Sequence, residues 1–226
     1  MGEPGGWTEV LWQALGIGGA CVFYGRFYIQ WIVSEIKKRS VIPIAFWYLS
    51  SGGSLALLAY GVHIASPLGT LSQSLNTVIY SRNLVHIWRE RGVLSKRRNV
   101  LVHAAVAAVA VTALWFTALI WLNEYQTTRS GETADARQTW LWLGIGLVGQ
   151  GLFAGRFLIQ WIATELRRKS VVPTVFWYLS VVAASLLMAS FVQRREWVYA
   201  VGLLATTLVY LRNLWFIHKG KPVASD

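Results

Sequence analysis

The sequence predicts an all-α membrane protein with seven transmembrane helices, built as a 3+1+3 parallel repeat of three-helix bundles. Hydrophobic residues make up 55% of the 226 residues and include thirteen tryptophans. A helix needs about 20 mostly apolar residues to cross roughly 30 Å of hydrocarbon, and its backbone polar groups must be satisfied within the helix. Seven segments meet this requirement, at approximately 8–36, 45–64, 70–88, 99–123, 139–166, 175–192 and 196–216.

An internal duplication organises these segments. Residues 25–50 align without a gap with residues 155–180, and sixteen of the 26 paired positions are identical. The same offset of 130 residues pairs 80–84 with 210–214. Self-similarity of this length indicates repeated structural units. Two three-helix units face the same way only if a further helix crosses between them, and segment 99–123, which has no counterpart, fits that position.

The repeat predicts three parts of the chain. They are a first three-helix repeat at 1–92, a linker transmembrane helix with an outer loop at 93–137, and a second three-helix repeat at 138–226.

The net charge of +11 is unevenly distributed between the predicted loops. With the N-terminus outside, thirteen lysines and arginines fall in the inner loops and tail, and four fall in the outer loops. This is the positive-inside pattern of membrane proteins. It excludes nucleic acid as the expected partner and predicts contact with anionic lipid headgroups.

Polar residues recur inside the predicted spans, and four of them are arginines. An arginine at the bilayer centre costs about 2.5–3.5 kcal/mol, so each must face the protein interior or a wet cavity. Arginine also binds phosphate or carboxylate with two parallel hydrogen bonds. The predicted substrate-binding set is Arg26, Gln30, Trp47, Asn76, Tyr80, Arg82, Asn83, Arg156, Gln160, Trp177, Tyr210, Arg212 and Asn213. The alternative is that these groups only hold helices together through hydrogen bonds.

Two pairs of equivalent residues have competing interpretations. Trp47 and Trp177 lie near a predicted membrane interface, where an aromatic belt is the ordinary reading and sugar stacking is the alternative. Glu35 and Glu165 precede basic runs, so pairing with basic side chains one turn away competes with a coupling or gating role.

No catalytic or metal-binding motif stands out. The four histidines, at 63, 86, 103 and 218, lack the spacing of metal ligands. The chain has no phosphate-binding lysine loop, no serine elbow and no intramembrane carboxylate pair. We therefore expect no catalytic residue, no metal, no cofactor and no enzymatic activity.

The repeated motifs resemble those of a known family. They read Gly-Arg-Phe-x-x-Gln-Trp-x-x-Ser/Thr-Glu, then Ser-x-x-Pro-x-x-Phe-Trp-Tyr-Leu-Ser, then Tyr-x-Arg-Asn-Leu. Both copies resemble the lipid A biosynthesis N-terminal domain family and, more widely, the PQ-loop and SWEET transporter clan. The resemblance implies bacterial envelope glycolipid metabolism. Together with the positive-inside pattern, it predicts a multi-pass protein of the inner membrane, with a periplasmic N-terminus and a cytoplasmic C-terminus.

Three functions are compatible with this resemblance. The first is a transporter or flippase for a polyprenyl-phosphate-linked sugar or a related anionic glycolipid precursor of lipid A or lipopolysaccharide. The second is a SWEET-like facilitator of a small sugar or sugar acid. The third is a non-transporting membrane subunit that positions a glycosyltransferase. The expected partners are membrane lipid, a lipid-linked sugar and a polyprenyl-phosphate glycosyltransferase; the sequence does not determine the oligomeric state.

Overall fold

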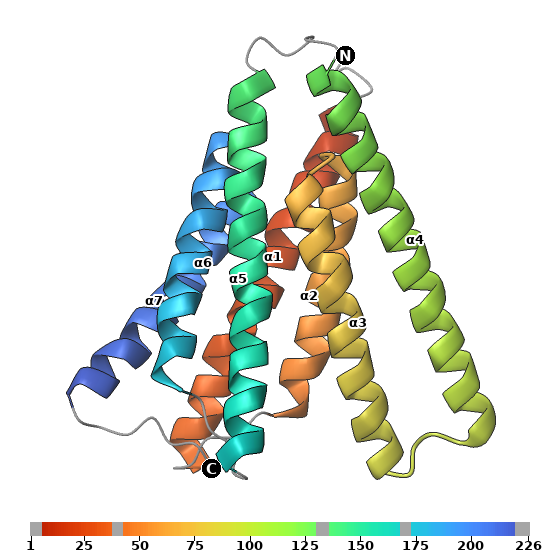
Figure 1. The fold of residues 1–226 in the computed structure, drawn as a ribbon. Coiled ribbons are helices and arrows are strands. Elements are labelled where there is room, and N and C mark those ends of the chain that lie inside the picture. The colour runs from red at the N-terminus through yellow and green to blue at the C-terminus, as the bar shows by residue number, and fades with distance from the viewer. Residues whose placement is uncertain (1–5, 38–42, 130–135, 168–172, 220–226) are drawn as a thin grey trace. The chain divides into compact units, whose positions relative to one another are not determined.

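The computed structural model describes residues 6–37, 43–129, 136–167 and 173–219. Within these ranges every regular element is an α-helix, as the sequence predicts (Figure 1). The helices are α1 (Gly6–Lys37), α2 (Ile44–His63), α3 (Pro67–Glu90), α4 (Lys96–Arg129), α5 (Ala136–Arg167), α6 (Thr174–Gln193) and α7 (Trp197–His218).

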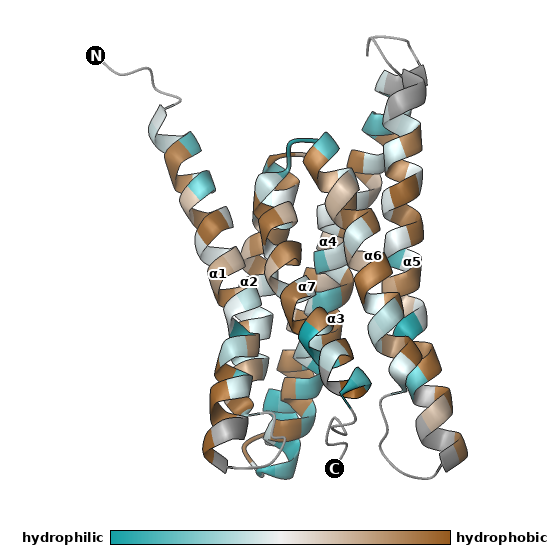
Figure 2. Cartoon of the chain, turned by 90° about the vertical axis from the view of Figure 1, so that its left-hand side faces the viewer, coloured by the Kyte–Doolittle hydropathy of each residue, from teal (hydrophilic) through white to brown (hydrophobic). Residues whose placement is uncertain are grey.

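Four of these helices contain a stretch long and apolar enough to cross a membrane. The stretches are Lys96–Thr127, Thr139–Gln160, Thr174–Gln193 and Trp197–Trp215. Figure 2 shows apolar residues along much of the length of α5. Four of the seven predicted spans therefore have the length and apolar composition of membrane helices, and spanning by α1, α2 and α3 stays a prediction.

The chain divides into two compact units. The first contains α1 as far as Gln30, together with α2, α3 and α4, and the second contains α1 from Trp31 onward, together with α5, α6 and α7. The predicted three-part division of the sequence stays a prediction.

Close helix contacts through small residues hold the first unit together. A Cβ atom added to Gly53 on α2 would lie 2.7 Å from the backbone nitrogen of Phe23 on α1, and one added to Gly19 would lie 2.8 Å from the Cβ of Ala56. The missing side chains therefore allow the two backbones to approach, as at small-residue interfaces in membrane bundles. Helix α3 lies beside both α2 and α4 (Figure 1).

Hydroxyl pairs link the helices of the first unit. Buried Ser54 on α2 and Thr77 on α3 share a hydrogen bond of 2.6 Å between their oxygens. Ser74 on α3 lies 3.3 Å from the hydroxyl of Thr117 on α4. Each hydroxyl has a partner on the neighbouring helix. These buried polar groups are therefore satisfied, and they also fix the position of one helix along the other.

The second unit packs α6 against both α5 and α7. Ala183 on α6 is fully buried beside Gly149 on α5. The Ser190 hydroxyl donates to the backbone oxygen of Trp142, and the rings of Phe191 and Tyr199 stack with centroids 5.0 Å apart. Contacts from α6 to both neighbours thus make it the central helix of the unit.

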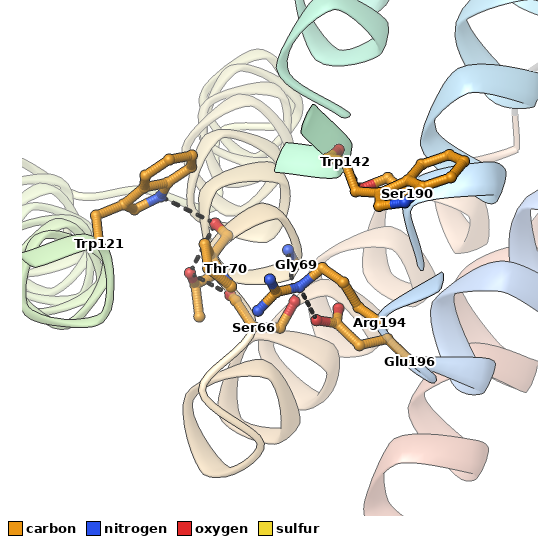
Figure 3. Close-up of polar contacts among 9 residues, drawn as sticks. Ser66, Gly69, Thr70, Trp121, Trp142, Ser190, Arg194 and Glu196 are labelled. Carbon is orange, nitrogen blue, oxygen red and sulfur yellow. Dashed lines mark hydrogen bonds and ion pairs between the residues drawn. The ribbon is translucent and has the colours of Figure 1, made fainter. Parts of the chain in front are cut away.

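The turns that follow α2 and α6 have the same backbone conformation. Ala65 and Arg195, which are 130 residues apart, both adopt positive φ, at 50° and 60°. In the first turn the Ser66 N–H donates to the Gly61 oxygen, which is the hydrogen bond of a Schellman motif. The Ser66 side chain then caps α3 by accepting from the Gly69 N–H at 2.9 Å (Figure 3). The duplication therefore extends to the geometry of these turns.

The corresponding turn of the second unit is closed by an ion pair instead of a serine cap. Arg194 donates through Nε to a carboxylate oxygen of Glu196 at 2.9 Å (Figure 3). Glu196 is buried and precedes the first residue of α7. A carboxylate is favourable near a helix N-terminus because the backbone N–H groups there carry partial positive charge.

Candidate functional site: two arginine cages and an open groove

Arg26 lies inside a cage of aromatic rings in the first unit. Its side chain is only 4% exposed, and its guanidinium carbon lies 3.6 Å from the centroid of the Phe23 ring. The rings of Phe27, Phe46 and Tyr80 lie within 5.4 Å of the same atom. The guanidinium donates to the Phe23 backbone oxygen and to the Tyr80 hydroxyl, the latter at 3.1 Å. The cage therefore joins side chains of α1, α2 and α3.

Arg156 occupies the equivalent cage in the second unit. It is 8% exposed and donates to the Ser180 hydroxyl at 2.7 Å. Its guanidinium carbon lies 4.1 Å from the Phe153 ring centroid, 5.0 Å from that of Phe176 and 5.3 Å from that of Tyr210. The Ser180 hydroxyl in turn donates to the Phe176 backbone oxygen. This cage joins α5, α6 and α7.

These cages surround each buried arginine with aromatic rings and give its guanidinium hydrogen-bond acceptors. A cation over an aromatic face gains about 2 kcal/mol or more when both groups are shielded from water, and the hydrogen bonds add to this. Arg26 and Arg156 therefore have the protein contacts that the helix-holding alternative requires. Substrate binding by either residue stays a prediction.

The two tryptophans of the predicted site belong to the cages. The ring centroid of Trp47 lies 6.3 Å from that of Tyr80, and that of Trp177 lies 6.2 Å from that of Tyr210. Gln30 and Gln160 are half-buried one turn beyond the two arginines. The structure thus brings Arg, Trp and Tyr together in each unit, as matched sets.

The predicted asparagines make local hydrogen bonds. Asn83 and Asn213 each donate through Nδ2 to the backbone oxygen four residues earlier, at 2.8 Å. Asn76 donates to Gln73 at 3.4 Å. The three amides therefore lie along α3 and α7, outside the arginine cages.

The remaining two arginines of the set differ in their surroundings. Arg82 lines a groove of about 290 Å³ together with Ile79, Asn83 and His86. In the second unit, the Arg212 guanidinium lies 5.1 Å from the centroid of the Trp31 ring. His86 was not among the residues predicted from the sequence. Its spacing of four residues after Arg82 places both on one helix face and would have indicated it.

Two further predictions concern a coupling or gating role for two glutamates and the absence of a metal site. The side chains of Glu35 and Glu165 fall outside the described residues. Among the residues that the structure does describe, no group of three or more His, Cys, Asp or Glu side chains is arranged to hold a metal ion.

Comparison with models of known protein families shows which family this chain belongs to. The family described as the Lipid A Biosynthesis N-terminal domain matches residues 15–85 and again residues 145–215. The chain belongs to this family. The two matches coincide with the two repeats, so the predicted tandem duplication of this domain is confirmed.

Curated relatives of the chain are enzymes. The chain is 30% identical over 210 residues to a lipid-A-disaccharide synthase of Chlamydia felis, covering 88% of this chain and 32% of the relative. The synthase of Chlamydia trachomatis serovar D is 29% identical, with 85% and 33% covered. That of Chlamydia abortus is 30% identical, with 88% and 32% covered. The chain spans about a third of the length of these relatives, and no solved structure matches it.

These relatives overturn the predicted function. The expectations of a transporter or flippase and of a SWEET-like facilitator are wrong, because the relatives are named for the synthesis of a lipid A disaccharide. The expectation that the protein is not an enzyme is contradicted by the same names. The error has two causes. Intramembrane arginines do not by themselves indicate transport, because aromatic cages give two of them partners within their own unit. A lack of catalytic motifs also says little about activity in a chain that matches only a third of each synthase.

Proposed function

We propose that this chain takes part in lipid-A-disaccharide synthase activity, as the part of that enzyme that lies in the membrane and holds its lipid substrate. The observation that carries the proposal is the extent of the match. It covers 85–88% of the chain in the three synthases described above, so it includes both repeats and the helix between them. Similarity to the synthases along most of the chain supports a role shared with them more strongly than similarity limited to a short motif would.

The fold supports the part assigned to the membrane. Four helices have the length and apolar composition of membrane spans, and both units contain at least one of them. A buried arginine cage joins the helices of each unit, and hydroxyl pairs add to this in the first unit. A rigid domain of this kind suits a role in holding a lipid-linked sugar at a constant depth, where the synthase acts on it.

We further propose that all seven helices cross the bacterial inner membrane in the 3+1+3 arrangement, with the N-terminus periplasmic and the C-terminus cytoplasmic. The duplication and the excess of basic residues in alternate loops support this topology. Single cysteines placed at position 3 and position 224 of a Cys21→Ser chain would test it. A membrane-impermeant thiol reagent added to intact spheroplasts is expected to label the first and spare the second, and the opposite pattern would reverse the topology.

The role in synthesis is tested by depletion in the source bacterium. Membranes from depleted cells are supplied with the precursors of lipid A, and formation of the disaccharide is measured by mass spectrometry. We expect formation to fall by at least tenfold and to return when purified chain is added back in liposomes. Undiminished formation in depleted membranes, with the chain absent by immunoblot, would refute the proposal.

The Chlamydia felis synthase provides a matched control for this experiment. Added to the depleted membranes at the same concentration, it is expected to restore disaccharide formation as well. Restoration by the relative but not by this chain would show that the two proteins differ in function despite their similarity.

A further inference from the structure

We propose that the groove on α3 binds the phosphate group of a membrane lipid through Arg82, Asn83 and His86. No comparison assigns a ligand to these residues. Lipid binding is measured without disaccharide synthesis, so failure of this proposal and failure of the synthase role are distinguishable.

The described residues that line the groove lie on one face of α3. Ile79, Arg82, Asn83 and His86 follow the spacing i, i+3, i+4 and i+7, which aligns them along α3. Arg82 and His86 are both exposed, and among the described residues neither makes a hydrogen bond or an ion pair. Asn83 uses one amide N–H for the Ile79 oxygen, and a second N–H remains on the same nitrogen.

These three side chains provide the donors that a phosphate requires. The guanidinium of Arg82 presents a planar fork that matches two phosphate oxygens. The imidazole of His86 donates at least one N–H in either of its neutral tautomers, and Asn83 adds its amide. Three donors within about one turn of a single helix can contact a phosphate group from one side.

The position of Arg82 along α3 supports a ligand at membrane depth. Arg82 precedes the end of the helix at Glu90 by eight residues, or about 12 Å at the rise of an α-helix. Helix α3 packs against α4, whose Lys96–Thr127 stretch is apolar enough to cross a membrane. An arginine at that depth needs an anion or water, and a lipid phosphate is the anion that a bilayer itself supplies.

The face of α3 before the groove favours a lipid over a soluble phosphate. Leu75 and Ile79 precede Arg82 on this face and are 44% and 52% exposed. Apolar side chains followed by Arg82 and His86 match an acyl chain followed by a phosphate headgroup.

The second repeat does not reproduce this groove. Arg212 is equivalent to Arg82, but its guanidinium lies against the Trp31 ring. Position 86 corresponds to Phe216, which has no hydrogen-bonding group. The duplicated chain therefore offers the complete set of donors in its first repeat only, and we expect one lipid phosphate bound per chain at this kind of site.

Lipid binding by the purified full chain tests the proposal. The chain in detergent is titrated with short-chain phosphatidic acid, short-chain phosphatidylcholine and inorganic phosphate, and binding is followed by microscale thermophoresis. We expect phosphatidic acid to bind at least tenfold more tightly than either of the other probes. Equal affinity for inorganic phosphate would overturn the lipid assignment. Equal affinity for phosphatidylcholine, whose phosphate charge is balanced by choline, would overturn recognition of an anionic phosphate headgroup.

Three variants locate the binding. Arg82→Gln is expected to weaken phosphatidic acid binding about tenfold, and His86→Phe, which installs the residue of the second repeat, about threefold. Arg98→Gln removes an equal charge from an exposed position outside the groove and is expected to bind as the wild type does. Wild-type affinity in Arg82→Gln, or an equal loss in Arg98→Gln, would refute the site. Because Arg82 and His86 are exposed, all three variants should keep the wild-type melting temperature.

Discussion

Replacing Gly53 by alanine probes the contact between α1 and α2 in the first unit. The added Cβ would lie 2.7 Å from the backbone nitrogen of Phe23 and 2.8 Å from its Cα and Cβ atoms. Carbon atoms in favourable contact are about 3.5–4.0 Å apart, so α1 would have to move away by roughly 1 Å. The atoms in the way are mostly backbone, which no change of rotamer can relieve.

The expected magnitude follows from two opposing terms. Alanine is a better helix former than glycine by about 0.8–1.0 kcal/mol. Overpacking a tight contact costs typically about 1–3 kcal/mol. Gly52→Ala provides the matched control, because it is the neighbouring position on α2, is exposed and has no atom within 4 Å of the added Cβ. The helix-forming term is the same in both variants, so the difference between them isolates the overpacking cost.

Reversible unfolding in mixed micelles measures this difference. We expect Gly52→Ala to raise the free energy of unfolding by about 0.5–1 kcal/mol, and Gly53→Ala to fall below that variant by about 1–3 kcal/mol. The effect should extend to Arg26, because Phe23 supplies both a ring and a carbonyl oxygen to its cage. If Gly53→Ala is as stable as Gly52→Ala, the two helices do not approach as closely as described and the reasoning is refuted.

Two further predictions concern stability and are checked in the same unfolding assay. Ala65 adopts a φ of 50°, which an L residue rarely does, so Ala65→Gly is expected to raise the free energy of unfolding by about 0.5–1 kcal/mol; an unchanged or lower value would contradict this. Ser54→Ala leaves the buried hydroxyl of Thr77 without its 2.6 Å partner and is expected to cost about 1–3 kcal/mol. Adding Thr77→Val to Ser54→Ala should then cost less than the sum of the two single changes, and strict additivity would show that the hydroxyls do not interact.

Much of the architecture could be predicted from the sequence, because its signals are local. The apolar segments predicted the helices, and the offset of 130 residues predicted the duplication that the family match confirms. The shared positive φ of Ala65 and Arg195 is a further sign of that duplication, which the structure adds. The need for protein partners around buried arginines was also foreseeable from the cost of an unpaired charge. The function was not, since an arginine within a span has the same sequence signature whether it binds substrate or holds helices together.

The limits of prediction are clearest at the equivalent positions of the two repeats. Gly53 corresponds to Ala183, so the duplication alone does not indicate that α1 and α2 approach closely at Gly53. His86 corresponds to Phe216, so the duplication does not indicate that a histidine lines the groove. Differences between copies carry structural information only when the neighbours of each position are known.

The sequence by itself determined the helical class, the tandem duplication and the family of this protein, because length, apolar content and register are properties of the chain alone. Only the tertiary structure decided the surroundings of the arginines. Arg26 and Arg156 are enclosed by rings from three helices each, whereas Arg82 lies in an open groove. Helical periodicity predicts which residues share a face of one helix. The side chains that contact that face come from segments distant in sequence, so these contacts form only when the helices pack.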